Sequence, residues 1–225
     1  MIFFDLDDTL LDHSAAAEAG ATKVYETYRS SFKEDLEAFL LRWETVSEKY
    51  FQSNSPYLRL TTEERRRGRV REIFSNPLSD KEADTRFQVY LDTYESSWKL
   101  FPDSIPCLRS LKGRPLGLIT NGEKEQHRSK IQKTDLGAYF STVIISWEVG
   151  CSKPERAIFE LAAKQAGVPL TDCVYIGDRL ETDARGSQKA GMKGIWLNRK
   201  ARREQTDLGI SVIGSLMELP GLIPF

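Results

Sequence analysis

The sequence predicts an α/β fold in which a doubly wound parallel sheet carries an inserted all-helical domain. An apolar, strand-like run opens the chain, and similar runs return after residue 115, where they alternate with helical segments. Such alternation is typical of a parallel sheet covered by helices on both faces. Residues 15–99 show helical patterns and no convincing strand. We therefore expect an α/β core built from residues 1–14 and 100–225, and a helical cap domain formed by residues 15–99.

The first strand is expected at residues 2–4, a short apolar run rich in phenylalanine. Asp5, Asp7 and Thr9 follow it directly. Ligands of open parallel sheets bind at the carboxyl ends of strands, and the alternation of Asp5 and Asp7 allows both to face one such site. Carboxylates held together repel one another unless a cation neutralises them. The strand exit is therefore a candidate cation site, with an ordinary turn as the alternative.

The inserted block is expected to hold about four helices, because apolar side chains recur at helical spacing over residues 36–50 and 87–98. Thr61 and Ser79 are each followed three residues later by Glu, which is the capping-box pattern of a helix start. Most aromatic side chains of the block are expected to pack between helices. The candidates for stacking on a substrate base are Tyr25, Tyr28, Trp43, Tyr50 and Phe51.

Residues 63–71 form a locally basic segment that contains five arginines. A charged run on a helix is usually a solvated face, and we expect that here. The alternative is a contact to an anionic part of a substrate or partner.

The second half of the chain is expected to add five strands separated by helices. Gly137, Gly167 and Gly191 are expected to end three of these helices. Pro154 is expected in the first turn of another, a position where the missing proline N–H has no helical partner. The expected strands are residues 116–119, 143–145, 173–176, 195–197 and 210–213.

The composition excludes several classes of partner. The 32 basic and 33 acidic residues nearly balance, so no electrostatic attraction to a nucleic acid polymer or an anionic membrane is expected. No apolar run approaches the length of a membrane span. The strand expected at the N-terminus leaves no place for a basic leader, and the three scattered cysteines fit reduced thiols. We expect a cytoplasmic monomer that acts on a small molecule.

Polar side chains follow later strands as they follow the first. Thr120 and Asn121 come after the second strand, and Lys153 precedes a helix. Asp178 follows another strand, with Asp183 shortly beyond it. Each feature alone fits a turn, a helix cap or a solvated lysine. Together they are far more specific, because the carboxyl ends of parallel strands meet at one edge of the sheet.

In this order the residues resemble the motifs of the haloacid dehalogenase-like (HAD) hydrolase superfamily. The first motif is matched by Asp5-Leu6-Asp7-Asp8-Thr9, the second by Thr120-Asn121-Gly122, the third by Lys153-Pro154, and the fourth by Gly177-Asp178 through Asp183. The resemblance implies a HAD-like Rossmannoid core with a helical cap after the first motif. Residues 191–199 look like the branch that holds cytosolic nucleotidases and N-acylneuraminate-phosphate phosphatases. Arg179 departs from the pattern, because relatives often carry a small polar residue there.

The resemblance implies a phosphatase that forms an aspartyl-phosphate, and the chemistry of phosphoryl transfer agrees with it. Asp5 would be the nucleophile. Asp7 would protonate the leaving oxygen and then take a proton from the attacking water. Thr120 and Asn121 would hold phosphate oxygens, and Lys153 would bind phosphate and neutralise developing charge.

The same resemblance implies Mg²⁺ as the cofactor. Oxygen ligands from Asp5, Asp178 and the main-chain carbonyl of Asp7 would suit this hard cation, with Asp183 in support. Arg179, beside Asp178, is a bulky cation that would alter the metal site.

The expected substrate is a small phosphate monoester, with a nucleoside 5′-monophosphate as the first choice. A sugar phosphate or an N-acylneuraminate phosphate is the alternative, and a hydrolytic dehalogenase or a phosphomutase of the same superfamily is a more distant one. A dehalogenase would not need Asp7, because halide leaves without a proton. A signalling receiver domain also combines carboxylates, Thr and Lys, but its phosphate acceptor lies on a later strand and it needs no long helical insert.

Overall fold

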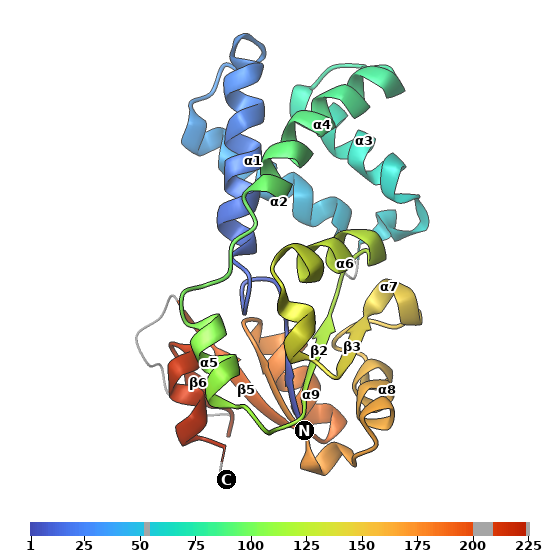
Figure 1. Cartoon of the computed structure of the whole chain (residues 1–225). Coiled ribbons are helices and arrows are strands. Elements are labelled where there is room, and N and C mark those ends of the chain that lie inside the picture. Colours follow the sequence, from blue (N-terminus) through green and yellow to red (C-terminus); the bar gives the residue numbers. More distant parts are fainter. Residues whose placement is uncertain (52–54, 200–208, 224–225) are drawn as a thin grey trace. The chain divides into compact units, whose positions relative to one another are not determined.

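The structure, a computed structural model, describes residues 1–51, 55–199 and 209–223. The chain forms two compact units, drawn in Figure 1. The core unit comprises Met1–His13 and Lys99–Phe225, and the helical unit comprises Ser14–Trp98. The chain therefore leaves the core unit once, directly after its first strand, and returns to it once.

Within the described residues, six parallel strands form one sheet in the core unit. The strand order is β3-β2-β1-β4-β5-β6, which places β1 in the middle of the sheet. This doubly wound order confirms the fold class predicted from the sequence. The strands are β1 (Ile2–Phe4), β2 (Leu116–Thr120), β3 (Thr142–Ile145), β4 (Val174–Gly177), β5 (Lys193–Leu197) and β6 (Ser211–Ile213).

Helices of the core unit pack against this sheet. One face carries Phe3, Ile119 and Tyr175, which share a fully buried cluster with Phe159 of α8 and Ala190 of α9. Burial from both sides explains why the strands are apolar runs rather than alternating ones. The helices are α5 (Ser104–Ser110), α6 (Lys124–Lys133), α7 (Ser146–Val149), α8 (Arg156–Ala166) and α9 (Gly186–Ala190), with the 3₁₀ turns η3 (Leu136–Tyr139), η4 (Leu170–Asp172) and η6 (Leu216–Gly221) and the π-helix η5 (Leu180–Arg185).

Pro154 does not lie in the first turn of α8, contrary to the sequence prediction. The helix begins at Arg156, and the Lys153–Pro154 peptide bond is cis. The side chain of Asn121 binds both the main-chain N–H and the carbonyl of Lys153, each at 2.9 Å. The Glu155 N–H also donates to the carbonyl of Ser152 at 2.8 Å. The segment ahead of α8 is thus fixed as a turn, and the helix starts after it.

The helical unit contains α1 (His13–Thr27), α2 (Leu36–Phe51), α3 (Thr62–Phe74) and α4 (Asp80–Ser96), with short 3₁₀ turns η1 (Arg29–Ser31) and η2 (Pro56–Arg59). Both predicted capping boxes are present, at Thr61 and at Ser79. The interior is largely aromatic. The ring centroids of Trp43 and Tyr90 lie 5.0 Å apart, and those of Tyr90 and Tyr94 lie 5.4 Å apart. These contacts confirm that the aromatic residues mainly pack between helices.

Two arginines of the basic segment are buried, so the expectation of a solvated helix face was wrong for them. Arg65 and Arg69 on α3 are 2% and 5% exposed. The guanidinium of Arg69 lies 4.7 Å from the ring centroid of Trp43 and 4.6 Å from that of Tyr90. Aromatic faces attract a guanidinium electrostatically, and they line the inner side of α3. By contrast, Arg67 pairs with Asp84 at 2.7 Å on the outside of the unit.

The two connections between the units run side by side. The N–H of Asp12 donates to the carbonyl of Lys99, and the N–H of Phe101 donates to that of Leu10, both at 2.9 Å. Leu11 forms an antiparallel bridge with Leu100. The segment that leaves β1 and the segment that returns to the core are therefore joined into a short two-stranded link.

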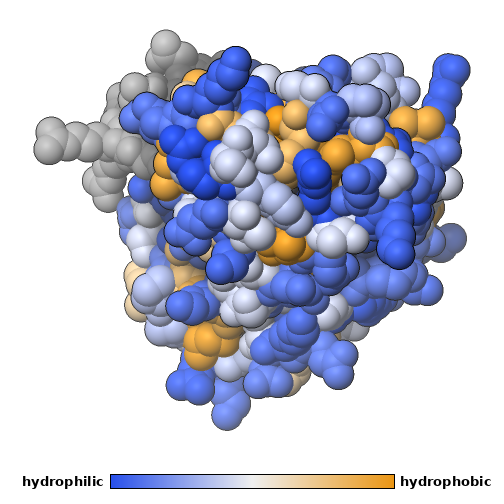
Figure 2. Space-filling model, turned by 90° about the horizontal axis from the view of Figure 1, so that it is seen from above, coloured by the Kyte–Doolittle hydropathy of each residue, from blue (hydrophilic) through white to orange (hydrophobic). Residues whose placement is uncertain are grey.

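The face drawn in Figure 2 is mostly hydrophilic and is interrupted by a few groups of hydrophobic residues. Among the residues that the structure describes, no helix combines the length and the apolar composition needed to cross a membrane.

Candidate active site

The carboxyl ends of β1, β2 and β4 meet at the centre of the sheet. Phe4, the last residue of β1, is in register with Leu118 on one side and Ile176 on the other. The next residue, Asp5, donates its main-chain N–H to the carbonyl of Ile176 at 2.8 Å. Its side chain therefore leaves the sheet beside the ends of both neighbouring strands. The strand order reverses at this point, which is where open α/β sheets bind their ligands.

Asp5, Asp178 and Asp183 form an acidic cluster at these strand ends. One carboxylate oxygen of each lies within 4.8 Å of the others. Asp5 follows β1, Asp178 follows β4, and Asp183 lies on η5. Asp5 and Asp183 are 6% and 1% exposed, so little water separates their charges. Carboxylate oxygens gathered in this way are the donors that a hard divalent cation prefers.

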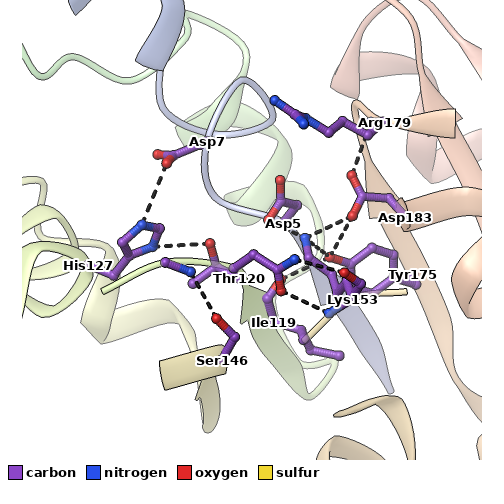
Figure 3. A network of polar contacts seen from close by, with 12 residues as sticks. Asp5, Asp7, Ile119, Thr120, His127, Ser146, Lys153, Tyr175, Arg179 and Asp183 are labelled. Atoms are coloured by element: carbon purple, nitrogen blue, oxygen red, sulfur yellow. Dashed lines mark hydrogen bonds and ion pairs between the residues drawn. The ribbon is translucent and has the colours of Figure 1, made fainter. Parts of the chain in front are cut away.

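The ammonium group of Lys153 lies against this cluster, as Figure 3 shows. Its Nζ atom is 2.6 Å from Oδ1 of Asp5 and 2.8 Å from Oδ1 of Asp183. The Nζ atom also donates to the hydroxyl of Tyr175 at 2.8 Å, and that hydroxyl donates to the carbonyl of Ile119 at 2.9 Å. Lys153 is 3% exposed, so its charge is held in the interior by two carboxylates and a phenol.

Burial and mutual repulsion shift the pKa values of these carboxylates. Burial raises the pKa of Asp178 to about 8, and the charges of Asp5 and Asp183 add to the increase. Burial also raises the pKa of Asp5 to about 7, although Lys153 offsets part of the shift. Burial alone would lower the pKa of Lys153, but Asp183 and Asp5 raise it above its ordinary value. The cluster thus carries carboxylates that a further positive charge would stabilise in the ionised form.

The residues expected to bind phosphate lie beside the cluster. Thr120 ends β2, is 1% exposed, and forms a hydrogen bond with Nδ1 of His127 at 3.2 Å. The Asn121 side chain is occupied with the main chain of Lys153 and thereby fixes where that lysine enters the site. Gly122 donates its N–H to the hydroxyl of Ser146 at 3.0 Å, which ties the turn after β2 to the end of β3. The part of Asn121 in phosphate binding stays a prediction.

Asp7 lies apart from the acidic cluster and is surrounded by basic groups. Figure 3 shows its carboxylate turned toward His127 and away from Asp5. Lys130 on α6 donates to both of its oxygens, at 2.8 and 2.7 Å. Nε2 of His127 and Nδ1 of His13 lie 3.7 and 3.8 Å from one of these oxygens. A carboxylate in such surroundings is held as the anion.

The pKa values around Asp7 follow from these contacts. Burial by itself raises the pKa of Asp7, but Lys130, His13 and His127 together hold it well below its usual range. Burial lowers the pKa of His127 to about 3, and the charge of Lys130 adds to that effect. Burial likewise lowers the pKa of His13. At neutral pH the two imidazoles are therefore neutral, and the positive charge that faces Asp7 comes from Lys130.

Arg179 does not place its charge on the acidic cluster. Its main-chain N–H donates to Oδ2 of Asp183 at 3.0 Å and so helps to position that carboxylate. Its side chain is exposed and runs away from Asp183 in Figure 3. The departure from the family pattern at this position therefore changes the surroundings of the site rather than the arrangement of the three carboxylates.

The structure brings Asp5, Thr120, Lys153, Asp178 and Asp183 together. It places the carboxylate of Asp7 outside this group, beside Lys130 and His127. Sequence reasoning did not single out the residues that contact these side chains. Tyr175 lies inside an apolar strand, and only its hydroxyl distinguishes it from the neighbouring core residues. Ser146, His127 and Lys130 share no motif with the strand exits. The one available signal was the spacing of His127 and Lys130, which puts them on the same face of a helix that directly follows the Thr120 turn.

The fold and site define a doubly wound α/β protein with a cluster of acidic side chains at the carboxyl ends of its central strands. The family model of the haloacid dehalogenase-like hydrolases matches residues 1–191. The chain belongs to this family.

Curated relatives include several phosphatases. The chain is 29% identical to the N-acylneuraminate-9-phosphatase of Mus musculus, over 99% of this chain and 92% of that protein. It is 32% identical to the glyceraldehyde 3-phosphate phosphatase of Methanopyrus kandleri, over 88% of this chain and 83% of the relative. A pyrimidine 5′-nucleotidase of Escherichia coli is 34% identical, but over 54% of this chain and 56% of its own length.

Among solved structures, the magnesium-bound HAD hydrolase YfnB of Bacillus subtilis superposes with a TM-score of 0.79. The sequence identity is 20%, and the match covers 100% of this chain and 98% of that one. This similarity confirms the fold over the full chain.

Proposed function

We propose that this protein is a Mg²⁺-dependent phosphatase that hydrolyses a small phosphate monoester through an aspartyl-phosphate on Asp5. The observation that carries the proposal is the contact of Asp5 with Lys153 at 2.6 Å within a buried acidic cluster at the strand ends. A nucleophilic carboxylate must remain ionised near an anionic substrate, and a buried ammonium group favours that state. The family and the phosphatases among its relatives support the same chemistry.

The donor set fits a magnesium ion. Three carboxylates offer oxygens within 4.8 Å of one another. Burial, with the charges of the neighbouring carboxylates, raises the pKa of two of them, Asp5 and Asp178. Asp5 and Asp178 would hold the ion, and Asp183 would support it. The main-chain carbonyl of Asp7 remains the expected further ligand. A bound Mg²⁺ would supply positive charge that stabilises the phosphoryl group in the transition state.

Each residue of the site has a separate role in the proposed reaction. A carboxylate oxygen of Asp5 attacks phosphorus, and the ester P–O bond breaks as Asp7 gives a proton to the leaving oxygen. Asp7 must bind that proton before this step, because its carboxylate beside Lys130 is otherwise held as the anion. The alcohol departs and leaves a phosphoryl group on Asp5. Asp7, now a carboxylate, takes a proton from a water molecule that attacks phosphorus, which releases phosphate and restores Asp5. Lys153 and Thr120 would stabilise the phosphoryl oxygens throughout.

We place a phosphate ester of a carbohydrate or another small polyol first among the substrates. Two relatives that match most of the chain are named for an N-acylneuraminate phosphate and for glyceraldehyde 3-phosphate. The aromatic residues that made a nucleoside monophosphate the first expectation are mostly packed inside the helical unit: Tyr25, Trp43 and Tyr50 are no more than 8% exposed. The nucleotidase match spans only 54% of the chain, and nucleoside 5′-monophosphates become the second candidate.

A panel of phosphorylated metabolites tests the proposal. The purified full chain is assayed for phosphate release from N-acylneuraminate 9-phosphate, glyceraldehyde 3-phosphate, hexose phosphates and nucleoside 5′-monophosphates, with magnesium chloride or with EDTA. We expect turnover that needs magnesium, that is lost in Asp5→Asn, and that favours a carbohydrate ester. A preference for nucleotides would overturn the substrate class alone. Halide release from 2-haloacids without phosphatase activity would overturn the reaction class.

A further inference from the structure

Tyr175 is a buried tyrosine on β4 whose side chain reaches a second strand. It is 0% exposed, and its ring meets that of Phe159 edge-on, with the ring centroids 5.4 Å apart. Its hydroxyl donates to the main-chain carbonyl of Ile119 at 2.9 Å. Ile119 lies on β2, and β1 separates β2 from β4. The side chain therefore crosses β1 and is fixed by contacts at its ring and at its hydroxyl.

The hydroxyl of Tyr175 acts as an acceptor toward the site. A phenol has one O–H to donate and keeps lone pairs that can accept. Its oxygen lies 3.4 Å from Oδ1 of Asp183, farther than the 2.9 Å to the carbonyl of Ile119, so the carbonyl takes the hydrogen. A lone pair is then left for the Nζ atom of Lys153, which donates at 2.8 Å. Tyr175 is thus a neutral acceptor held on the frame of the sheet.

Each N–H bond of the Lys153 ammonium group has an acceptor. Besides the hydroxyl of Tyr175, Oδ1 of Asp5 lies 2.6 Å from Nζ and Oδ1 of Asp183 lies 2.8 Å from it, as Figure 3 shows. An ammonium group has three N–H bonds, so all of them are used. A lysine stem is flexible, and loss of one acceptor would allow Nζ to move. The hydroxyl therefore helps to define where this positive charge lies.

We propose that Tyr175 is a positioning residue that holds the ammonium group of Lys153 beside the transferring phosphoryl group. The inference rests on the proposed phosphatase function and deepens it, because Tyr175 acts through Lys153. Asp5, the proposed nucleophile, lies 2.6 Å from Nζ, so a phosphoryl group that Asp5 accepts is next to the same ammonium group. Stabilisation of charge on the phosphoryl oxygens requires a donor that is already in place.

Removal of the hydroxyl alone tests this role. Tyr175→Phe keeps the ring, and kcat/KM is measured with 4-nitrophenyl phosphate and magnesium chloride. Misplacement of a group by about 1 Å costs up to roughly 10²-fold in rate, so we expect a loss of at least about tenfold. A smaller loss would overturn the inference. Tyr139→Phe makes the same change at a partly buried tyrosine of η3 and should retain wild-type kinetics.

Inhibition by orthovanadate separates positioning from a smaller fraction of active protein. Analogues of a transition state bind through the contacts that stabilise it, and the inhibition constant does not depend on how much of the protein is active. We expect the inhibition constant of orthovanadate to rise at least about threefold in Tyr175→Phe, because Lys153 no longer meets the vanadate oxygens in place. A smaller rise would show a general structural role and overturn the inference.

A double substitution asks whether Tyr175 acts through Lys153. Once Lys153→Met has removed the ammonium group, Tyr175→Phe should change kcat/KM by less than about threefold, because residues in contact that serve one step have non-additive effects. A larger loss in the Lys153→Met background would mean that Tyr175 acts independently of the lysine, and would overturn the inference.

Folding is checked first by circular dichroism and thermal unfolding. If Tyr175→Phe does not fold, the comparisons are made with Tyr175→Met, which also lacks the hydroxyl and fills the space with a flexible apolar side chain. Failure of the proposed function has a separate signature: a wild-type protein without phosphatase activity, or full activity in Asp5→Asn. The comparisons with Tyr175→Phe in an active enzyme address the tyrosine alone.

Discussion

Lys153 is the residue on which the charges of the site converge, since Asp5 and Asp183 both lie within 2.8 Å of its Nζ atom. Lys153→Met removes the positive charge and leaves two buried carboxylates without it. We expect kcat to fall on the order of 10²–10³-fold, because charge that develops on the phosphoryl oxygens is no longer stabilised. Breaking a buried ion pair costs about 3 kcal/mol or more of unfolding free energy. Phosphate release and urea unfolding in EDTA measure the two effects.

Lys164→Met is the control for that substitution, because Lys164 is an exposed lysine on α8. It should leave both quantities unchanged. A Lys153→Met protein with wild-type turnover would remove Lys153 from the site.

The raised pKa values of Asp5 and Asp178 predict how stability depends on pH. They are about 7 and about 8 in the folded protein, against an ordinary value of 3.8. Folding therefore favours the protonated carboxyls, and their contribution is complete below pH 3.8 and is lost as the pH rises to about 8. The lowered pKa of His127 acts in the opposite direction, but only below pH 6.5. Metal-free protein should thus lose stability between pH 6.5 and about 8.

Thermal unfolding at a series of pH values in EDTA measures this loss. Magnesium chloride should restore stability, more strongly at the alkaline end, because the ion binds the folded carboxylates. Asp178→Asn should flatten the pH dependence. A melting temperature that rises over this range in the metal-free protein would show that the carboxylates are already ionised.

Sequence reasoning predicted the strand-end residues and not their contacts. Asp5, Thr120 and Asp178 follow apolar runs, and parallel strands must bring such exits to one edge. Lys130 gives no such signal, because a lysine on a polar helix resembles its solvated neighbours until tertiary packing shows which face is buried.

At the scale of elements, the turn between β2 and α6 depends on a glycine. A Cβ atom on Gly122 would lie 1.8 Å from Nε2 of His127. Gly122→Ala must therefore displace the imidazole from Thr120 and Asp7, and a displacement of about 1 Å in a site costs up to roughly 10²-fold in rate. We expect kcat/KM for alkyl phosphates to fall by about 10- to 100-fold.

Gly137→Ala provides the comparison for that change. Its Cβ would meet Ile131 at 3.6 Å, an ordinary contact, so activity should be retained. Equal kinetics of the two alanine variants would mean that His127 is not needed in its present position.

The start of a helix could be predicted where residues close to it in the sequence determine it. The capping boxes at Thr61 and Ser79 formed as expected because each satisfies its own helix end. The start of α8 was missed because Asn121, distant in sequence, holds the main chain of Lys153 in a turn. The burial of Arg69 was missed for the same kind of reason, since its aromatic neighbours come from α2 and α4.

At the scale of the whole molecule, the alternation of strands and helices after residue 115 is enough to predict the doubly wound class. Two paired connections, at residues 10–12 and 99–101, join the core unit to the helical unit. We propose that they act as a hinge and that the helical unit is a cap that closes over the site during phosphoryl transfer.

Amide hydrogen exchange tests the hinge. Exchange at residues 10–12 and 99–101 should slow when orthovanadate and magnesium chloride are added, while the amides of β1 remain protected throughout. Unchanged exchange at both connections, with vanadate shown to inhibit the enzyme, would argue for a cap that does not move.

The most direct test of the central claim is to locate the phosphoryl group during turnover. Protein is acid-quenched while it hydrolyses 4-nitrophenyl phosphate with magnesium chloride, and its peptides are analysed by mass spectrometry. We predict phosphate on Asp5, more of it in Asp7→Asn because water then lacks its base, and none in Asp5→Asn. A phosphoryl group on another residue, or undiminished turnover in Asp5→Asn, would contradict the account.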